Sequence, residues 1–138
     1  MMVAERVVFD TNVWISGLMW RGNPYRCLLL ARGKVVEACY CHQMAAELAR
    51  KLRNPFGFSE NRTEAVMYDL RRTCTRVNIT RTLHVVIADP DDDKFVECAV
   101  VAGANSIVSG DGHLLELGKF QDVTMFSAAQ FLERFQAE

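Results

Sequence analysis

Acidic residues occur in this sequence where apolar runs stop. Asp10 directly follows the run Val7-Val8-Phe9, and Asp111 comes three residues after the run Ile107-Val108. Apolar runs of this kind indicate strands that are buried on both faces of a parallel sheet. Open α/β sheets bind their ligands at the carboxyl ends of such strands. We therefore expect Asp10 and Asp111 to meet at one edge of a sheet.

Two predicted helices supply further carboxylates. Glu47 lies in the first half of one helix, and an acidic run that includes Asp92 stands at residues 89–93, where another helix begins. Converging carboxylates repel one another and raise one another's pKa unless a cation lies between them. Mg²⁺ accepts a few carboxylate oxygens and keeps waters, and paired ions of this class promote attack of water on a phosphodiester. The four acids together predict a divalent-cation site.

Each acid also has a purely structural interpretation. The acidic run at residues 89–93 suits a helix start, because Asp caps helices and the helix dipole favours negative charge there. Glu47 suits a solvated helix face, and Asp111 suits a turn between two glycines. Asp10 is the exception, since an ionised carboxylate after a buried strand needs a partner. The metal-site hypothesis thus rests on the whole set.

Small polar residues flank the predicted acids. Thr11, Asn12 and Ser109 are candidates to hydrogen-bond the carboxylates and fix their orientation, although the same residues also suit helix caps. His113 either faces a substrate or stands at a helix start. Both interpretations remain open from the sequence.

Apolar patterning and turn residues predict strands that alternate with helices. The expected strands are residues 7–9, 35–40, 106–109 and 123–126, with a strand or extended coil at 84–87. The expected helices are residues 14–18, 24–31, 44–52, 65–74, 89–102, 113–117 and 128–135, with a possible capping box at Asn61 and Glu64. This alternation predicts an α/β fold, a three-layer sandwich with a central, mostly parallel sheet.

Length and composition predict one globular domain over residues 1–138. Half of the residues are hydrophobic, yet no apolar run approaches the roughly 20 residues that span a bilayer. The first six residues carry an acid and lack the apolar region of a secretory signal. The five cysteines form no C-x-x-C pair, so a disulfide framework or zinc site is not expected. We expect a cytoplasmic protein without a membrane association.

Basic residues are concentrated in the middle of the chain. The segment from Arg50 to Arg81 contains eight basic residues and three acids, a net charge of +5 in a chain whose total is −1. A basic surface beside an acidic site would suit a phosphate backbone, and Arg50 and Lys51 are the candidates nearest Glu47. A solvated helical hairpin of ordinary composition explains the same segment equally well.

In order along nearly the whole chain, these residues resemble a PIN-domain ribonuclease, most closely the toxins of prokaryotic toxin–antitoxin pairs. The motifs that carry the resemblance are Phe9-Asp10-Thr11-Asn12-Val13, Glu47, Asp89-Pro90-Asp91-Asp92-Asp93-Lys94-Phe95 with Ala99, and Ile107-Val108-Ser109-Gly110-Asp111 with Leu114-Leu115.

The resemblance implies Mg²⁺- or Mn²⁺-dependent cleavage of single-stranded RNA by Asp10, Glu47, Asp92 and Asp111. Asp10, Asp92 and Asp111 would be the main metal ligands, with Glu47 as a ligand or as the group that positions the water. Because Asp91 and Asp93 flank Asp92, either of them could be the third acid in its place. Family toxins usually form homodimers and are silenced by a cognate antitoxin, so both partners are expected here.

The chain departs from part of the family pattern at His113. Some family members carry a further acid two residues after the fourth one, where this sequence has His113. The departure puts in doubt how a second metal ion is held, but not the first.

Two other functions compete with the nuclease. One is a catalytically silent relative that binds RNA or protein. The other is phosphoryl transfer through an aspartyl-phosphate at Asp10, although that chemistry typically needs a second acid two residues later, where this chain has Asn12.

Overall fold

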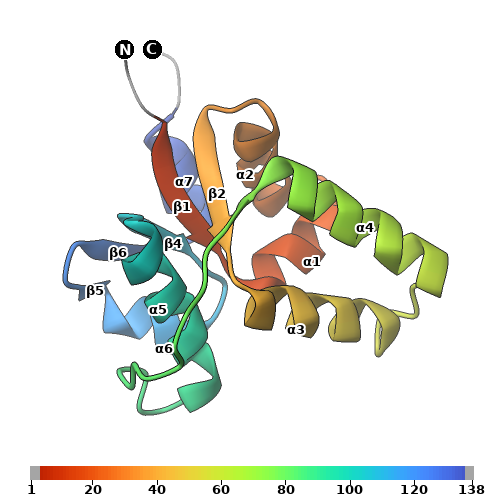
Figure 1. Cartoon of the computed structure of the whole chain (residues 1–138). Coiled ribbons are helices and arrows are strands. Elements are labelled where there is room, and N and C mark those ends of the chain that lie inside the picture. Colours follow the sequence, from red (N-terminus) through yellow and green to blue (C-terminus); the bar gives the residue numbers. More distant parts are fainter. Residues whose placement is uncertain (1–3, 136–138) are drawn as a thin grey trace.

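Six strands form one central sheet in the order β3-β2-β1-β4-β6-β5 (Figure 1). The structure is a computed structural model, and it describes residues 4–135. The three residues at each end of the predicted domain lie outside the described part. The strands are β1 (Glu5–Phe9), β2 (Val36–Tyr40), β3 (Thr75–Arg76), β4 (Ser106–Val108), β5 (Lys119–Phe120) and β6 (Val123–Phe126).

The middle of the sheet is parallel and buried, as the apolar runs predicted. Phe9 of β1 lies opposite Val108 of β4, and Val7 lies opposite Ala38 of β2. All four residues are at most 1 % exposed. Only β5 runs antiparallel, beside β6 at one edge. The carboxyl ends of β1 and β4 therefore lie next to each other, and the residues that follow them share one edge of the sheet.

Helices cover both faces of the sheet and confirm the α/β prediction. In Figure 1, α5 lies in front of the central strands and α2 and α7 lie behind them. The helices are α1 (Thr11–Met19), α2 (Asn23–Arg32), α3 (His42–Arg53), α4 (Glu60–Thr73), the 3₁₀ turn η1 (Pro90–Asp92), α5 (Asp93–Ala102), α6 (Gly112–Leu117) and α7 (Ala128–Glu133).

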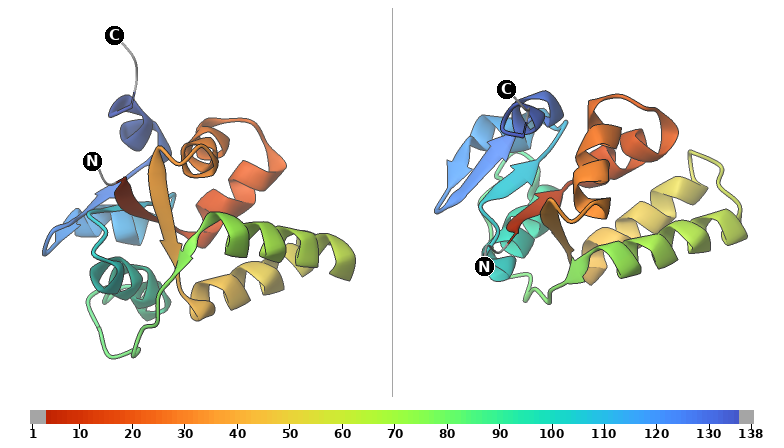
Figure 2. Two further views of the ribbon diagram at one scale, coloured as in Figure 1. Left: turned by 45° about the horizontal axis from the view of Figure 1, so that its top comes forward. Right: turned by 90° about the horizontal axis from the view of Figure 1, so that it is seen from above.

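The helices α3 and α4 form a hairpin that extends away from the sheet in both views of Figure 2. Ser59 caps α4, because its side chain accepts a hydrogen bond from the backbone N–H of Arg62. The predicted capping box at Asn61 and Glu64 is therefore wrong, and the helix starts five residues earlier than expected. Ser127 caps α7, as its hydroxyl type and its place before the predicted helix suggest, and it forms a full capping box with Gln130.

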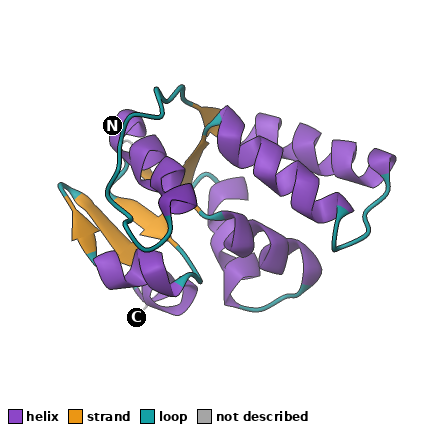
Figure 3. Ribbon diagram, turned by 90° about the horizontal axis from the view of Figure 1, so that it is seen from below, coloured by secondary structure: helices purple, strands orange, loops and turns teal. Residues whose placement is uncertain are grey.

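A long irregular segment joins β3 to η1 and runs alongside α5 (Figure 3). It contains residues 84–87, for which the sequence left strand and coil open, and the structure has coil there. The two-residue strand β5 was not predicted. It is too short to carry an alternating pattern, and its pairing with β6 depends on the turn at Gln121, where φ is +52°.

Within residues 4–135, no helix is long and apolar enough to cross a bilayer. The five cysteines are buried free thiols.

Candidate functional site

A cavity of about 80 Å³ opens at the carboxyl edge of the sheet. Its walls include all four predicted acids, Asp10, Glu47, Asp92 and Asp111, together with Asp89. The acids come from the ends of β1 and β4, from α3 and from η1, so the fold brings together residues that are far apart in the sequence. A cavity of this size has room for an ion with some of its waters.

Asp10 is held rigidly at the floor of the cavity. It is 2 % exposed and caps α1, accepting the backbone N–H of Val13 on Oδ1 at 2.9 Å. Its Oδ2 accepts a short hydrogen bond from the hydroxyl of Ser109. Burial raises the pKa of Asp10, and these hydrogen bonds only partly oppose that effect. A nearby cation would favour the ionised form of such a carboxylate.

Ser109 connects the two strand-end acids. Its hydroxyl donates to Asp10 and accepts the backbone N–H of Asp111 at 2.8 Å. Thr11 donates from its hydroxyl to Glu47 Oε2 at 2.7 Å. Asn12 lines the cavity with an exposed side chain. Two of the three predicted neighbours thus contact the carboxylates that they were expected to orient.

The environment of Asp92 is the strongest indication that the cavity binds a cation. It is 7 % exposed, and its Oδ2 atom is buried without a hydrogen-bond partner in the described part of the chain. Burial, followed by repulsion from Asp111 and Asp89, raises the pKa of Asp92 to about 7. A buried carboxylate oxygen without a partner is costly. A bound divalent cation would remove that cost, so the donor set fits such an ion.

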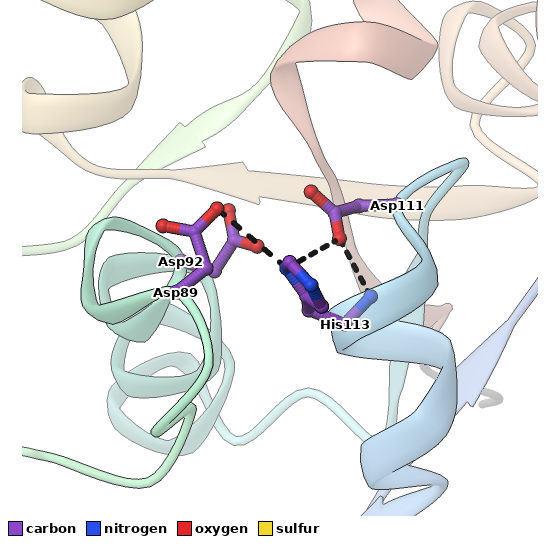
Figure 4. Close-up of side chains that lie close together, drawn as sticks. All are labelled: Asp89, Asp92, Asp111 and His113. Carbon is purple, nitrogen blue, oxygen red and sulfur yellow. Dashed lines mark hydrogen bonds and ion pairs between the residues drawn. The ribbon is translucent and has the colours of Figure 1, made fainter.

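One group of possible ligand atoms in the described residues contains Asp89, Asp92, Asp111 and His113, and it does not include Asp10 or Glu47 (Figure 4). One ligand atom from each residue lies within 4.8 Å of the others. His113 Nδ1 is 3.7 Å from Asp111 Oδ1 and 3.9 Å from Asp89 Oδ2. The sequence pattern did not single out Asp89 as a site residue, and it left His113 open between two interpretations. The only sequence signal for His113 was its position two residues after Asp111.

Two lysines surround Glu47. Lys94 Nζ lies 3.3 Å from its Oε2, and Lys51 Nζ lies 3.6 Å from its Oε1. Lys94 also contacts Asp91 Oδ2 at 3.2 Å. Glu47 therefore lies at the lysine side of the cavity, away from the group around Asp92. Lys51 points into the same cavity, whereas Arg50 lines a neighbouring groove.

The alternative ligands beside Asp92 have other contacts. Asp93 accepts the backbone N–H groups of Val85 and Val86, at 2.9 and 2.7 Å, and does not line the cavity. Asp91 is exposed and bound to Lys94. These contacts favour Asp92 over both neighbours, in agreement with the register that the sequence suggested.

A sequence profile of the PIN domain matches residues 6–113. The chain belongs to the PIN-domain family. No curated protein matches it in a sequence search.

The fold is similar to two solved structures at low sequence identity. VapBC2 from Rickettsia felis, crystallised bound to a DNA fragment from its promoter, has a TM-score of 0.64 at 12 % identity over 88 % of this chain and 98 % of that one. PAE2754 from Pyrobaculum aerophilum has a TM-score of 0.61 at 15 % identity over 99 % and 92 %. These similarities confirm the PIN-like fold of this chain.

Proposed function

We propose that this PIN-domain protein is a divalent-cation-dependent ribonuclease that cuts single-stranded RNA. The observation that carries the proposal is the cavity where Asp10, Glu47, Asp92 and Asp111 converge around a buried carboxylate oxygen without a partner. Membership of the PIN-domain family supports the same conclusion. Within the described residues Asp92 Oδ2 has no hydrogen-bond partner, so the contacts of the other acids do not account for the whole set.

In this proposal Asp10, Asp92 and Asp111 hold the cation, which is Mg²⁺ or Mn²⁺. When bound, the cation would activate a water for attack on the phosphodiester and stabilise the charge of the leaving oxygen. Ser109 keeps Asp10 and the start of α6 in register through its two hydrogen bonds. Glu47, oriented by Thr11, is placed to position the water or to bind a cation from the lysine side.

Arg50 and Lys51 would bind the substrate near the scissile phosphate. Lys51 reaches the cavity itself, where its ammonium faces Glu47. Arg50 is one position earlier on α3 and lines the adjoining groove. A flexible ammonium suits a single phosphate, and a guanidinium suits bidentate contact with a neighbouring one.

We further propose that the protein is the toxin of a toxin–antitoxin pair and forms a homodimer. The structural similarity to VapBC2, which was crystallised with promoter DNA, supports a cognate antitoxin as the partner. Exposed apolar residues at the end of α1, Met19 at 38 % and Trp20 at 61 %, offer a surface that a second chain would cover. Sedimentation of the purified chain alone and with an antitoxin encoded beside it tests both assemblies.

The decisive test is Asp10→Asn. Asn caps helices as well as Asp and can still accept the Val13 N–H on its Oδ1, while its amide N–H can donate to the Ser109 hydroxyl, so the fold is retained. Mn²⁺-dependent cleavage of a labelled single-stranded RNA should fall by about 100-fold or more, because loss of a ligand costs at least as much as loss of a group that orients one. Asp122→Asn is the control, since Asp122 is exposed in the turn before β6, at the opposite edge of the sheet.

Full cleavage by the Asp10→Asn variant would overturn the assignment of the site. A wild-type protein that binds RNA but cuts it with neither Mg²⁺ nor Mn²⁺ would instead favour the catalytically silent relative.

A further inference from the structure

The first inference concerns the identity of the ion, and it rests on the proposed cation site. His113 and Asp89 stand around Asp92 and Asp111, with one ligand atom of each residue within 4.8 Å of the others. The distances of 3.7 and 3.9 Å from His113 Nδ1 to the two carboxylates are too long for hydrogen bonds. Two ligand atoms that each lie about 2.1 Å from one ion are separated by about 3–4 Å, which matches these distances.

The unpartnered Oδ2 of Asp92 is an independent sign of a ligand in this cluster. This oxygen is buried and can only accept hydrogen bonds. Asp92 belongs to a group with Asp89, Asp111 and His113, and none of the described residues donates an N–H or O–H group to the oxygen. The side chain of His113 is about half exposed, so its imidazole can turn toward an ion without disturbing the core.

We propose that Asp89 and His113 bind the same ion as Asp92 and Asp111, and that His113 makes this site prefer a first-row transition ion over Mg²⁺. Mg²⁺ takes oxygen ligands and water, whereas an imidazole binds increasingly well along the series Mn²⁺, Fe²⁺, Co²⁺. A set of carboxylates that gains one imidazole therefore suits Mn²⁺ or a later ion.

The test measures ion binding without RNA. Isothermal titration calorimetry measures the affinities of the wild type and of His113→Gln for Mg²⁺, Mn²⁺ and Co²⁺. The comparison shows whether His113 binds the ion or only offsets the negative charge of the carboxylates. A nitrogen ligand predicts a loss of affinity that grows along this series, to about tenfold for Co²⁺ and less than twofold for Mg²⁺. Asp89→Asn, which can still cap η1, should weaken all three ions. His84→Gln is the matched control, because His84 also faces a carboxylate, Asp93, at 3.6 Å outside the cluster.

Equal affinities of the wild type and His113→Gln for all three ions would overturn the inference. So would a uniform gain in affinity, which would identify His113 as an imidazolium that merely neutralises the acids. Neither result depends on RNA cleavage, so the nuclease proposal stands or falls separately. Mn²⁺ that binds through His113 without any RNA cleavage would overturn only the nuclease proposal.

The second inference concerns the irregular segment of residues 80–86, which we call the strap. Two carboxylates one turn apart on α5 hold it. Glu97 accepts the backbone N–H groups of Thr80, Arg81 and Leu83, at 2.8, 2.9 and 3.2 Å, and the hydroxyl of Thr80 at 3.0 Å. Asp93 accepts the next two free N–H groups of the strap, those of Val85 and Val86. The strap is therefore fixed to α5 although it has no regular secondary structure.

The strap and α3 form the two walls of a groove of about 400 Å³. His42 and Arg50 line it from α3, and Arg81 and His84 line it from the strap. Glu47 and Asp91 belong to both this groove and the acid cavity, so the two are continuous. Arg50 and Arg81, the two ends of the basic segment, form no ion pair with residues 4–135.

We infer that this groove binds the phosphate backbone of the RNA strand on its way into the proposed cleavage site. The carboxylates that line it already have partners: Asp93 and Glu97 accept backbone N–H groups of the strap, and Lys94 contacts Glu47 and Asp91. Arg50 and Arg81 form no ion pair with these carboxylates, so both guanidiniums remain open to a phosphate. A single strand offers phosphates at a spacing that lets two arginines on opposite walls each contact one.

Fluorescence anisotropy of a labelled single-stranded RNA in EDTA tests this groove without cleavage. Arg50→Gln and Arg81→Gln should each weaken binding several-fold at low salt and reduce the dependence on salt by about one phosphate contact. Arg72→Gln is the matched control, because it makes the same charge change in the same basic segment but lies on α4. Binding by the Arg50 and Arg81 variants equal to that of the Arg72 variant would overturn the inference. Cleavage that remains metal-dependent in that case would leave the nuclease proposal intact.

Discussion

Replacing Asp92 by Asn should stabilise the metal-free protein at pH 8 while it removes the proposed metal site. Burial, followed by repulsion from Asp111 and Asp89, raises the pKa of Asp92 to about 7 in the folded protein. In the unfolded chain the pKa returns to about 3.9. The folded protein therefore holds an ionised Asp92 at a cost, and the neutral, isosteric Asn avoids that cost.

The pKa difference of about three units corresponds to about 4 kcal/mol, at 1.36 kcal/mol per unit. Water that reaches the cavity screens the charge of Asp92, so we expect a net gain of about 1–2 kcal/mol. The folded state binds the proton more tightly than the unfolded state does. The free energy of unfolding of the wild type should therefore fall as the pH rises from about 4 to about 7 and stay level above that. The advantage of the Asn variant should grow over the same window.

Urea unfolding in EDTA at pH 5 and pH 8 measures the effect, with Asp122→Asn as a control at an exposed site. Mn²⁺ at about 100 times its Kd should then stabilise the wild type by about 2.7 kcal/mol and leave the Asn variant unchanged. An Asn variant that is less stable than the wild type at pH 8 in EDTA would refute the reasoning. That outcome would mean that the ionised carboxylate makes favourable contacts in the absence of metal.

Three further substitutions have defined outcomes. Ser109→Ala should reduce RNA cleavage about 10–100-fold, because Asp10 loses the group that orients it; unchanged turnover of a folded variant would argue against that role. Glu97→Gln should lower the free energy of unfolding by about 1–2 kcal/mol and loosen the strap, since a neutral amide oxygen replaces a charged acceptor; hydrogen exchange at residues 80–83 should rise, and unaltered exchange would contradict the prediction. Gly17→Ala should cost about 1–3 kcal/mol, because the new Cβ would lie 2.5 Å from Cδ1 of the buried Leu28; an unchanged melting temperature would show that α2 shifts freely.

The sequence predicted most of the fold because its signals are local. The apolar runs before Asp10 and Asp111 marked the two central strands, and the turn residues Gly33 and Gly103 marked the ends of α2 and α5. Sequence patterns can assign a helix cap to the wrong residue when two residues that suit a cap are close together. Ser59 and Asn61 both suit a helix start, and only the path of the chain after α3 decides that Ser59 is the cap.

The sequence by itself also predicted that Asp10, Glu47, Asp92 and Asp111 gather, because parallel strands present their carboxyl ends and the helix starts that follow at one edge, but it did not mark Asp89. Only the tertiary structure decided how these acids are partnered. The rotation of α5 about its axis places Lys94 beside Glu47, whereas Lys51 lies one turn after Glu47 on α3 itself. The start of α6 brings His113 to Asp89 across the cavity. Side-chain neighbours on different elements depend on helix rotation and loop path, and these are set by packing over the whole core, which no short stretch of sequence encodes.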